Sequence, residues 1–229
     1  LYFDNPEIAI QIVGESDGQF NDGDYILFYS KGNKGWSEEN LTNHNLYDRN
    51  AYYYITYGNG AGKRIENLQQ PTQSATVNFS SFDEQVFHEQ NLKNLANLSR
   101  KWFGEEYNVN NSDSKQFDLV LADLSKPVNV EVNVAAVSSN SSSFNFVVNG
   151  QSFGSVDLLG ITSSSGGFEK SLRQNLNLTS STLKFDLAFN NNGVPSAKGY
   201  LDYINVNYTK KLEGYGRQFG FRVKEAANQ

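Results

Sequence analysis

The 229-residue sequence contains no cysteine and no methionine, and its only histidines are His44 and His88. Without cysteine the chain cannot form a thiol nucleophile, a disulfide framework, an iron–sulfur cluster or a thiolate zinc site. Two histidines leave little material for a histidine-based metal site or proton relay. Because the sequence has no initiating methionine, we expect it to be a processed piece of a longer protein.

Positive charge is also scarce. The chain has 19 basic and 25 acidic side chains, a net charge of −6. A negative net charge disfavours nucleic acids and anionic membrane surfaces, because basic surfaces recognise both. No run approaches the roughly 18 apolar residues that a membrane helix needs, and no signal-type segment opens the sequence. We therefore expect a chain that neither spans a membrane nor binds nucleic acid.

Asparagine and serine are abundant instead, and aromatic residues make up 14% of the chain. A polar, weakly charged, aromatic-rich sequence with many glycine and asparagine turn residues is typical of extracytoplasmic β-proteins. The length corresponds to one large or two small domains. A chain of this size buries about 70% of its unfolded surface, so its core needs no disulfide or metal.

Hydrophobic residues recur with a period of two in the second half of the chain. Valines alternate with polar residues over Val128–Val134, which indicates a half-buried strand. The same pattern over Phe144–Val148 is followed by Asn149 and Gly150, which predict a type I′ hairpin turn into Gln151–Leu158. Further strands are expected over 183–189, 200–208 and 219–223. Seven or eight strands between about 75 and 209 predict a jelly-roll-like antiparallel β-sandwich.

The first third of the chain has a different composition. Strands are predicted at Glu7–Val13 and Tyr25–Ser30, joined by an acidic turn, and at the tyrosine-rich segment Ala51–Tyr57. A polar stretch around Pro71 is the expected boundary. The fold class is therefore predicted as all-β, with a small β-rich domain over 1–74 and the sandwich over 75–229. Leucine spacing hints at one helix, at Asn91–Trp102, although asparagine and serine disfavour it.

Three aspartates of the acidic turn, Asp17, Asp22 and Asp24, are candidate calcium ligands. Calcium prefers oxygen ligands from a flexible loop, and this loop offers several. The turn lacks the twelve-residue EF-hand pattern, however, and aspartate also favours turns through hydrogen bonds to its own backbone. Calcium is therefore one interpretation of this turn, and a structural Asx turn is the other.

Asp202 is a fourth candidate ligand. It shares strand parity with Ile204, Val206 and Tyr208, so we expect it to point toward the apolar face. An ionised carboxylate there must be paired, hydrogen-bonded or bound to a metal. The alternative is an aspartate at the rim of the sheet, satisfied by backbone amides or an arginine.

No catalytic constellation is evident in the sequence. Serines are plentiful, but neither histidine lies in a recognisable nucleophile context. Glu89 beside His88 and the pair Glu105–Glu106 offer acid or base groups. A glycosidase, however, needs two carboxyls about 5–10 Å apart across a cleft, and spacing alone does not indicate one. We expect no catalytic activity from this chain.

Several segments resemble, in order along the chain, segments of PorU-type sortases of the type IX secretion system. They are Asp17–Phe20, Gly23–Tyr29, Asn45–Tyr57, Phe82–Glu84, Phe87–Glu89, Arg100–Glu105, Gly199–Tyr208, Leu212 and Phe219–Arg222. The resemblance covers nearly the whole chain, and the shared order makes it more specific than any single segment.

The resemblance implies a protein of the cell surface or outer membrane of a Bacteroidota-type bacterium. The catalytic part of such sortases is a gingipain-like cysteine peptidase of family C25. It removes the C-terminal sorting domain of secreted cargo and attaches the cargo to an anionic lipopolysaccharide. Since this sequence has no cysteine, the resemblance implies a non-catalytic region before the peptidase domain, which would begin near Gln229. No catalytic or cofactor-binding residue is carried over.

The implied partners are the peptidase domain of the same chain, secreted cargo and outer-membrane partner proteins. Asp24, Arg100, Trp102, Glu105 and Asp202 match positions of the family and are expected to be structural. Arg100 near Trp102 and Glu105 is expected to form a packed turn with a cation–π or ion-pair component.

A second hypothesis is a carbohydrate-binding or adhesin β-sandwich, stabilised by calcium at Asp202 or in the Asp17–Asp24 turn. A jelly roll hosts many unrelated roles, so the predicted fold alone does not decide between the two hypotheses.

Overall fold

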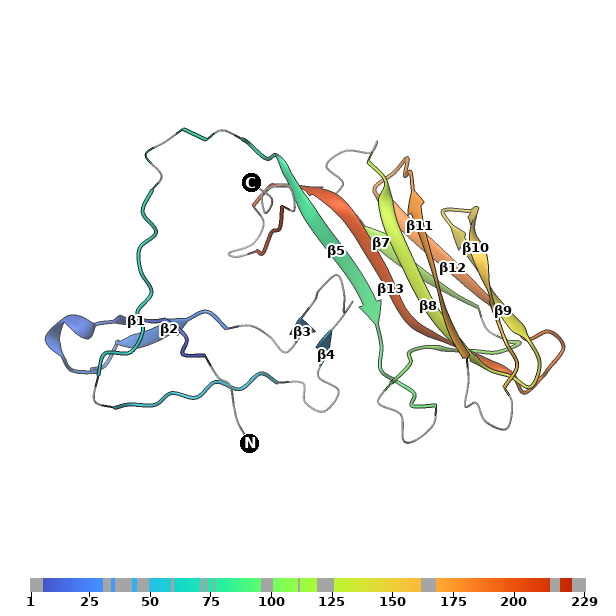
Figure 1. The fold of residues 1–229 in the computed structure, drawn as a ribbon, viewed down its shortest axis with the longest axis horizontal. Helices are drawn as coiled ribbons and strands as arrows, with labels where there is room; N and C mark the ends of the chain where they lie inside the picture. Colours follow the sequence, from blue (N-terminus) through green and yellow to red (C-terminus); the bar gives the residue numbers. More distant parts are fainter. Residues whose placement is uncertain are drawn as a thin grey trace. The chain divides into compact units, whose positions relative to one another are not determined.

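The chain folds into two compact units, Leu1–Thr76 and Val77–Gln229, in a computed structural model (Figure 1); the sequence prediction put the boundary at 74. The structure describes residues 6–30, 34–35, 43–44, 50–58, 60–70, 72, 74–75, 77–95, 101–110, 112–118, 126–161, 168–214 and 219–223. Apart from one 3₁₀ turn, Glu15–Asp17, every regular element in these ranges is a strand. The predicted all-β class is confirmed. No described helix has the length and hydrophobicity that a membrane span requires.

The first unit is built on a small hairpin. Strands β1 (Ile10–Val13) and β2 (Tyr25–Phe28) pair antiparallel, as predicted from the sequence. A later segment joins the other edge of β1, because the Ile10 N–H donates to the Lys63 carbonyl at 3.0 Å and the Ile65 N–H donates to the Ile10 carbonyl at 2.9 Å. Two short strands, β3 (Lys34–Gly35) and β4 (Asn43–His44), form a second pair.

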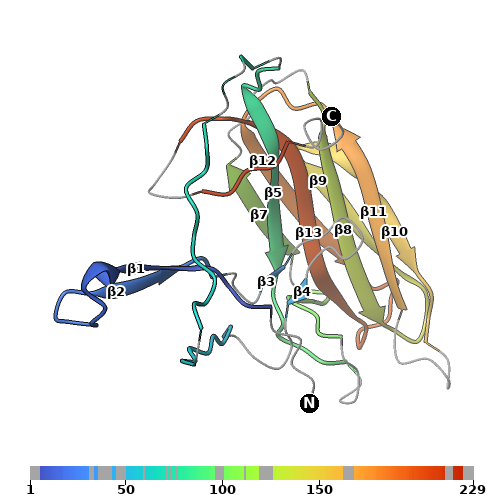
Figure 2. The same cartoon turned by 60° about the vertical axis from the view of Figure 1, so that its left-hand side comes forward.

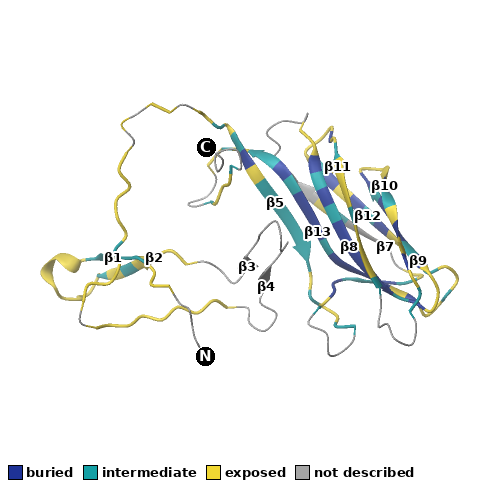
Figure 3. Cartoon of the chain, in the orientation of Figure 1, coloured by how far each residue is buried: buried dark blue, intermediate teal, exposed yellow. Residues whose placement is uncertain are grey.

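The predicted strand at Ala51–Tyr57 is wrong. This segment contains no strand, and Tyr52, Tyr54 and Tyr57 are 64%, 77% and fully exposed (Figure 3). Strand propensity largely measures how well a side chain packs on a half-buried pleated surface. None of the described residues of the first unit belongs to a buried core cluster, so these tyrosines have no such surface.

The described residues of the second unit form an antiparallel β-sandwich of eight long strands and one short one. The strands are β5 (Ser81–Glu89), β6 (Glu106–Tyr107), β7 (Ser112–Asp118), β8 (Val128–Val137), β9 (Ser142–Val148), β10 (Gln151–Leu158), β11 (Phe168–Leu176), β12 (Thr182–Asn190) and β13 (Lys198–Lys211). One sheet has the order β10-β9-β12-β7 and the other β11-β8-β13-β5, with β6 added to β13.

The pairing of the eight long strands is that of a jelly roll. The first long strand pairs with the last, β5 with β13, and the second pairs with the seventh, β7 with β12. The third pairs with the sixth, β8 with β11, and the fourth pairs with the fifth, β9 with β10. Because each strand pairs with a later one in nested order, the chain is a long hairpin rolled into two sheets.

The core lies between the two sheets and is filled by the inward side of each alternating strand. The four valines predicted to be inward, from Val128 to Val134, have no exposed surface. Aromatic rings fill the centre, where Phe144 contacts Tyr107, Phe146 and Phe189. The predicted type I′ turn is confirmed, since Asn149 and Gly150 have φ values of 48° and 78°.

The predicted helix at Asn91–Trp102 is wrong in its described parts, 91–95 and 101–102. Lys93 pairs with Phe103 instead: each residue's N–H donates to the carbonyl of the other, at 2.9 and 2.8 Å. Leu95 packs against a small cluster containing Phe103. Leu95 therefore packs beside the sheet rather than on a helical face.

The strand predicted at 219–223 is also wrong. The rings of Phe219 and Phe221 lie 6.3 and 6.4 Å from the ring of Phe82 on β5. One backbone bond, from the Asp83 N–H to the Arg222 carbonyl at 2.7 Å, links this segment to β5. The alternating aromatics therefore cover the end of the sandwich without forming a ladder.

Candidate functional site

A β-bulge in β13 sets which side chains reach the outer face of the five-stranded sheet. Leu201 pairs with Val134, and Tyr203 pairs with the adjacent Asn133, so Asp202 has no partner on β8. The extra residue shifts the alternation of the strand. Leu201 therefore joins the core, and Asp202 lies outside, where Lys101 contacts it. The predicted direction of Asp202 is wrong, because the bulge changes its parity.

The buried Asp202 carboxylate is paired with a cation, which is one of the arrangements expected from the sequence. Its side chain is only 5% exposed, and its Oδ2 lies 3.0 Å from the Lys101 Nζ, which is also 2.7 Å from Glu169. The partner is a lysine rather than the suggested arginine. Burial raises the pKa of Asp202 to about 6; Lys101 opposes this rise, and the nearby Glu89 and Glu169 add to it.

Replacing Asp202 by asparagine is expected to raise the free energy of unfolding at pH 7.5 by about 1 kcal/mol. The pKa of this carboxyl is about 6 in the folded chain and 3.8 in an unperturbed aspartate, so the carboxyl favours folding fully below pH 3.8. That contribution is lost as the pH rises through 6. The shift of the pKa corresponds to about 3 kcal/mol, with the attraction of Lys101 already included. We expect a smaller gain because the asparagine amide is itself a buried polar group. Urea denaturation at pH 7.5 and pH 4 should show the gain disappearing at pH 4. A less stable variant at pH 7.5 would contradict this prediction.

Strands β11, β8, β13 and β5 lie side by side in the five-stranded sheet (Figure 2). Their register places polar residues of its outer face in rows, one residue from each strand. The register aligns Asn175, Asn129, Asn207 and Gln85 in one row. All four side chains are primary amides, and we call these residues the amide row. Such a row can both donate and accept hydrogen bonds at every position.

Two more rows follow along the strands. Their members are Arg173, Glu131, Asn205 and Phe87, then Ser171, Asn133, Tyr203 and Glu89. Phe87 and Tyr203 stack with ring centroids 5.3 Å apart, and the Tyr203 hydroxyl donates to Glu131 at 2.9 Å. The aromatic pair is therefore surrounded by polar side chains on this face.

Cross-strand hydrogen bonds hold part of this face in place. Gln85 donates to Asn205 at 2.6 Å, and Asn129 donates to Asn175 at 2.8 Å. Asn133 donates to Ser171 at 2.8 Å, but its Oδ1 is buried and has no partner among the described residues. Asn133 is 7% exposed and Asn205 only 1%. Two amides are thus almost fully buried on the outer side of the sandwich, and one of them has an unpaired oxygen.

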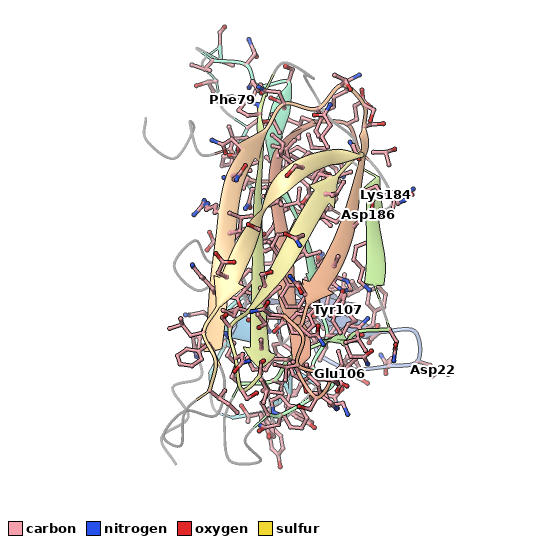
Figure 4. All side chains as sticks on the ribbon, turned by 90° about the vertical axis from the view of Figure 1, so that its right-hand side faces the viewer. Asp22, Phe79, Glu106, Tyr107, Lys184 and Asp186 are labelled. Atoms are coloured by element: carbon pink, nitrogen blue, oxygen red, sulfur yellow. The ribbon has the colours of Figure 1, made fainter. Side chains whose placement is uncertain are left out.

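The outer face of the other sheet is of a different kind. Its strand β12 carries an exposed ion pair, with Lys184 and Asp186 3.4 Å apart (Figure 4). Charged pairs of this type are common on a solvated sheet face and contribute little to stability. The described part of this face also carries the amides Gln116 and Asn145, so what distinguishes the five-stranded sheet is the alignment of four amides in one row.

A second polar cluster closes the sandwich where the two edge strands β5 and β7 face each other. Glu105 Oε1 lies 2.8 Å from His88 Nε2 on β5 and 2.6 Å from Lys115 Nζ on β7. Burial would raise the pKa of Glu105, but the hydrogen bonds from His88 and Lys115 outweigh it and lower this pKa to about 2. This carboxylate stays ionised and joins the two sheets. The expected packing of Arg100 lies outside the described residues.

The acidic turn of the first unit forms hydrogen bonds within itself. Asp17 accepts the Gln19 N–H at 3.0 Å and the Asn21 amide at 2.8 Å, and Asp24 accepts the Asn21 N–H at 2.6 Å. The described residues contain no group of three or more His, Asp or Glu side chains placed to hold a metal ion. Calcium at Asp17, Asp22, Asp24 or Asp202 stays a prediction.

Sequence reasoning identified Asp202 but missed the polar rows and the contact between Glu105 and His88. The available signal for the rows was the asparagines at alternate positions of two predicted strands, over 129–133 and 205–207. No local signal pairs His88 with Glu105 or Lys115, because their strands meet only in the folded sandwich.

Solved structures with a similar fold include dimeric latent PorU from Porphyromonas gingivalis. The match has a TM-score of 0.55 and 20% sequence identity and covers 71% of this chain. This chain spans 16% of the length of that PorU chain. At this identity the likeness establishes a PorU-like fold. No protein-family model and no curated protein matches the sequence.

Two carbohydrate-binding modules of the CBM36 type match with lower scores. One, in complex with calcium and xylotriose, has a TM-score of 0.36 and 16% identity, covering 54% of this chain and 98% of the module. The other belongs to a multidomain xylanase from the hindgut metagenome of Trinervitermes trinervoides. It has a TM-score of 0.34 and 13% identity, covering 58% of this chain and 99% of the module.

Proposed function

We propose that this chain is the non-catalytic, β-rich N-terminal region of a type IX secretion sortase at the surface of a Bacteroidota-type bacterium. There it positions a C25-type peptidase domain and contacts secreted cargo or outer-membrane partner proteins. The observation that carries the proposal is the PorU-like fold over 71% of the chain. The ordered sequence segments that resemble PorU-type sortases support it independently. The chain itself would not be an enzyme, since it lacks the nucleophilic cysteine.

The way the chain enters and leaves the sandwich suits a positioning role. Ser81 begins β5 and Lys211 ends β13, and the two residues are register partners. The next residues are also joined, since the Leu212 N–H donates to the Ser80 carbonyl at 2.9 Å. Entry and exit therefore lie side by side at one end of a closed jelly roll. A module of this form can be placed between other domains without separating them.

The first test is the gene sequence that follows Gln229. We expect an uninterrupted reading frame into a cysteine-peptidase domain with its histidine and cysteine. The present chain and that domain, produced separately, should then associate in isothermal titration. A stop codon or a sorting tail directly after Gln229 would contradict the proposal and leave the carbohydrate-binding or adhesin module as the function.

A further inference from the structure

We propose that the outer face of the five-stranded sheet binds an oligosaccharide, with the amide row contacting sugar hydroxyls and the Phe87–Tyr203 pair packing against a sugar ring. This site is an addition to the positioning role and does not depend on it. It uses the three rows of side chains described above and no residue of the first unit.

The first argument is that this sheet face carries residues that are disfavoured in β-strands. Asparagine is disfavoured in strands, yet Asn129, Asn133, Asn175, Asn205 and Asn207 all lie within strands of one sheet face. Valine, threonine or isoleucine would form the same ladder more readily. Four of these asparagines gain a cross-strand hydrogen bond, whereas Asn207 gains none within the described chain. A position that departs from local preference without a structural gain is expected at a functional site.

The second argument is that an amide of this face has no hydrogen-bond partner within the described chain. Asn207 is half-buried at the centre of the amide row, and its side chain makes no hydrogen bond to any described residue. The Oδ1 of Asn133 is also unpaired within the described chain, but this atom is buried and a ligand on the face does not reach it. The accessible polar group without a protein partner is therefore the Asn207 amide, which is free to bond a ligand.

The third argument concerns which ligand suits these groups. Sugar hydroxyls both donate and accept hydrogen bonds, and a primary amide offers both functions in one rigid plane. The stacked Phe87 and Tyr203 rings supply an apolar surface beside the amides. Small-ligand sites generally combine an apolar surface with a few fixed polar groups in this way.

Other ligand classes fit less well. The three rows contain one arginine, Arg173, and two glutamates, Glu89 and Glu131, so they do not attract phosphates or nucleic acids. Phe87 and Tyr203 are the only aromatic residues among them, and they bear no aliphatic residue of the kind that fills the core of a stable protein interface. A neutral polyhydroxylated ligand is the remaining match.

The size of the face indicates an oligosaccharide rather than a single sugar. Three rows two residues apart span roughly 14 Å along the strands, and four strands span roughly 14 Å across them. A chain of several sugar units lying on the sheet would contact all three rows.

The test is isothermal titration of the full chain with three neutral probes, cellohexaose, xylohexaose and mannohexaose. We expect at least one probe to bind with a Kd below about 1 mM. Asn207→Leu keeps the side-chain size and removes the amide, and it should weaken binding at least about tenfold with an unchanged or higher melting temperature. Phe87→Ala should weaken binding to a similar extent.

The matched control is Asn145→Leu, the same substitution at an exposed strand position of the other sheet. It should leave the affinity unchanged. The proposal is overturned if the wild-type chain binds none of the three probes at millimolar concentration. It is equally overturned if Asn207→Leu binds as tightly as the wild-type chain, or if Asn145→Leu weakens binding as much as Asn207→Leu.

Discussion

Replacing Phe144 by alanine is expected to lower the free energy of unfolding by about 3–5 kcal/mol. Phe144 has no exposed surface, and its ring contacts Tyr107, Phe146 and Phe189 at centroid distances of 5.4, 6.1 and 5.0 Å. Alanine would leave a cavity that three aromatic neighbours border, and rigid rings collapse poorly into such a space. Urea denaturation should show a lower midpoint with an unchanged slope.

Asn145→Ala is the matched control, because Asn145 is the next residue of β9 and points to solvent. It should change the free energy of unfolding by no more than about 0.5 kcal/mol. Gly199 gives a second check, since a Cβ added there would lie 2.5 Å from the Phe144 ring. Gly199→Ala alone should overpack the core. The double variant Gly199→Ala with Phe144→Ala should lose less free energy of unfolding than the sum of the losses of the two single variants. Full additivity, or a loss below 1 kcal/mol for Phe144→Ala, would show that this part of the core is not closely packed.

Replacing Glu105 by glutamine is expected to lower the free energy of unfolding at pH 7 by about 2 kcal/mol. The change preserves the shape of the side chain and removes the charge that His88 and Lys115 share at 2.8 and 2.6 Å. The carboxylate is 17% exposed, so glutamine gives up a charge-assisted hydrogen bond with Lys115 in a largely buried site. The shift of the Glu105 pKa from 4.5 to about 2 sets an upper limit of about 3 kcal/mol, which partial solvent exposure reduces.

The pH dependence of the free energy of unfolding distinguishes a loss of charge at residue 105 from a change in side-chain shape. Because the pKa of Glu105 is lower in the folded chain than the 4.5 of an unperturbed glutamate, its contribution to stability is fully present above pH 4.5 and is lost as the pH falls toward 2. The deficit of the variant should therefore shrink between pH 5 and pH 3 in urea denaturation. Glu106→Gln is the control, since its pair with the half-exposed Lys198 at 2.9 Å should contribute at most about 1 kcal/mol. An equal deficit at pH 5 and pH 3 would contradict the electrostatic explanation.

Local patterns predicted the elements whose structure depends on neighbouring residues. Valine alternation located β8, and Asn149 with Gly150 located the β9–β10 turn, because a type I′ turn depends only on residues that tolerate positive φ. The same local logic failed at Ala51–Tyr57, where strand-forming residues have no surface on which to pack. It also failed at Asn91–Trp102, where the described residues form no helix and Leu95 packs beside a sheet instead.

The candidate site was only partly predictable for the same reason. The sequence showed that an inward Asp202 must be paired, hydrogen-bonded or bound to a metal. Lys101 became its partner only because a bulge turned Asp202 to the outer face. The amide row joins residues as far apart in sequence as Gln85 and Asn207. Which strands become neighbours is decided by long-range pairing, and no local pattern in one sequence records it.

By itself, the sequence determined the all-β class, the inward and outward faces of the main strands, and the absence of thiol chemistry. Each of these follows from residue type or from alternation within one strand. The tertiary structure alone decided the jelly-roll pairing, the joining of the two sheets through Glu105, and the polar rows of the outer face. These features depend on strands that are distant in sequence, and only the burial of a shared core brings them together.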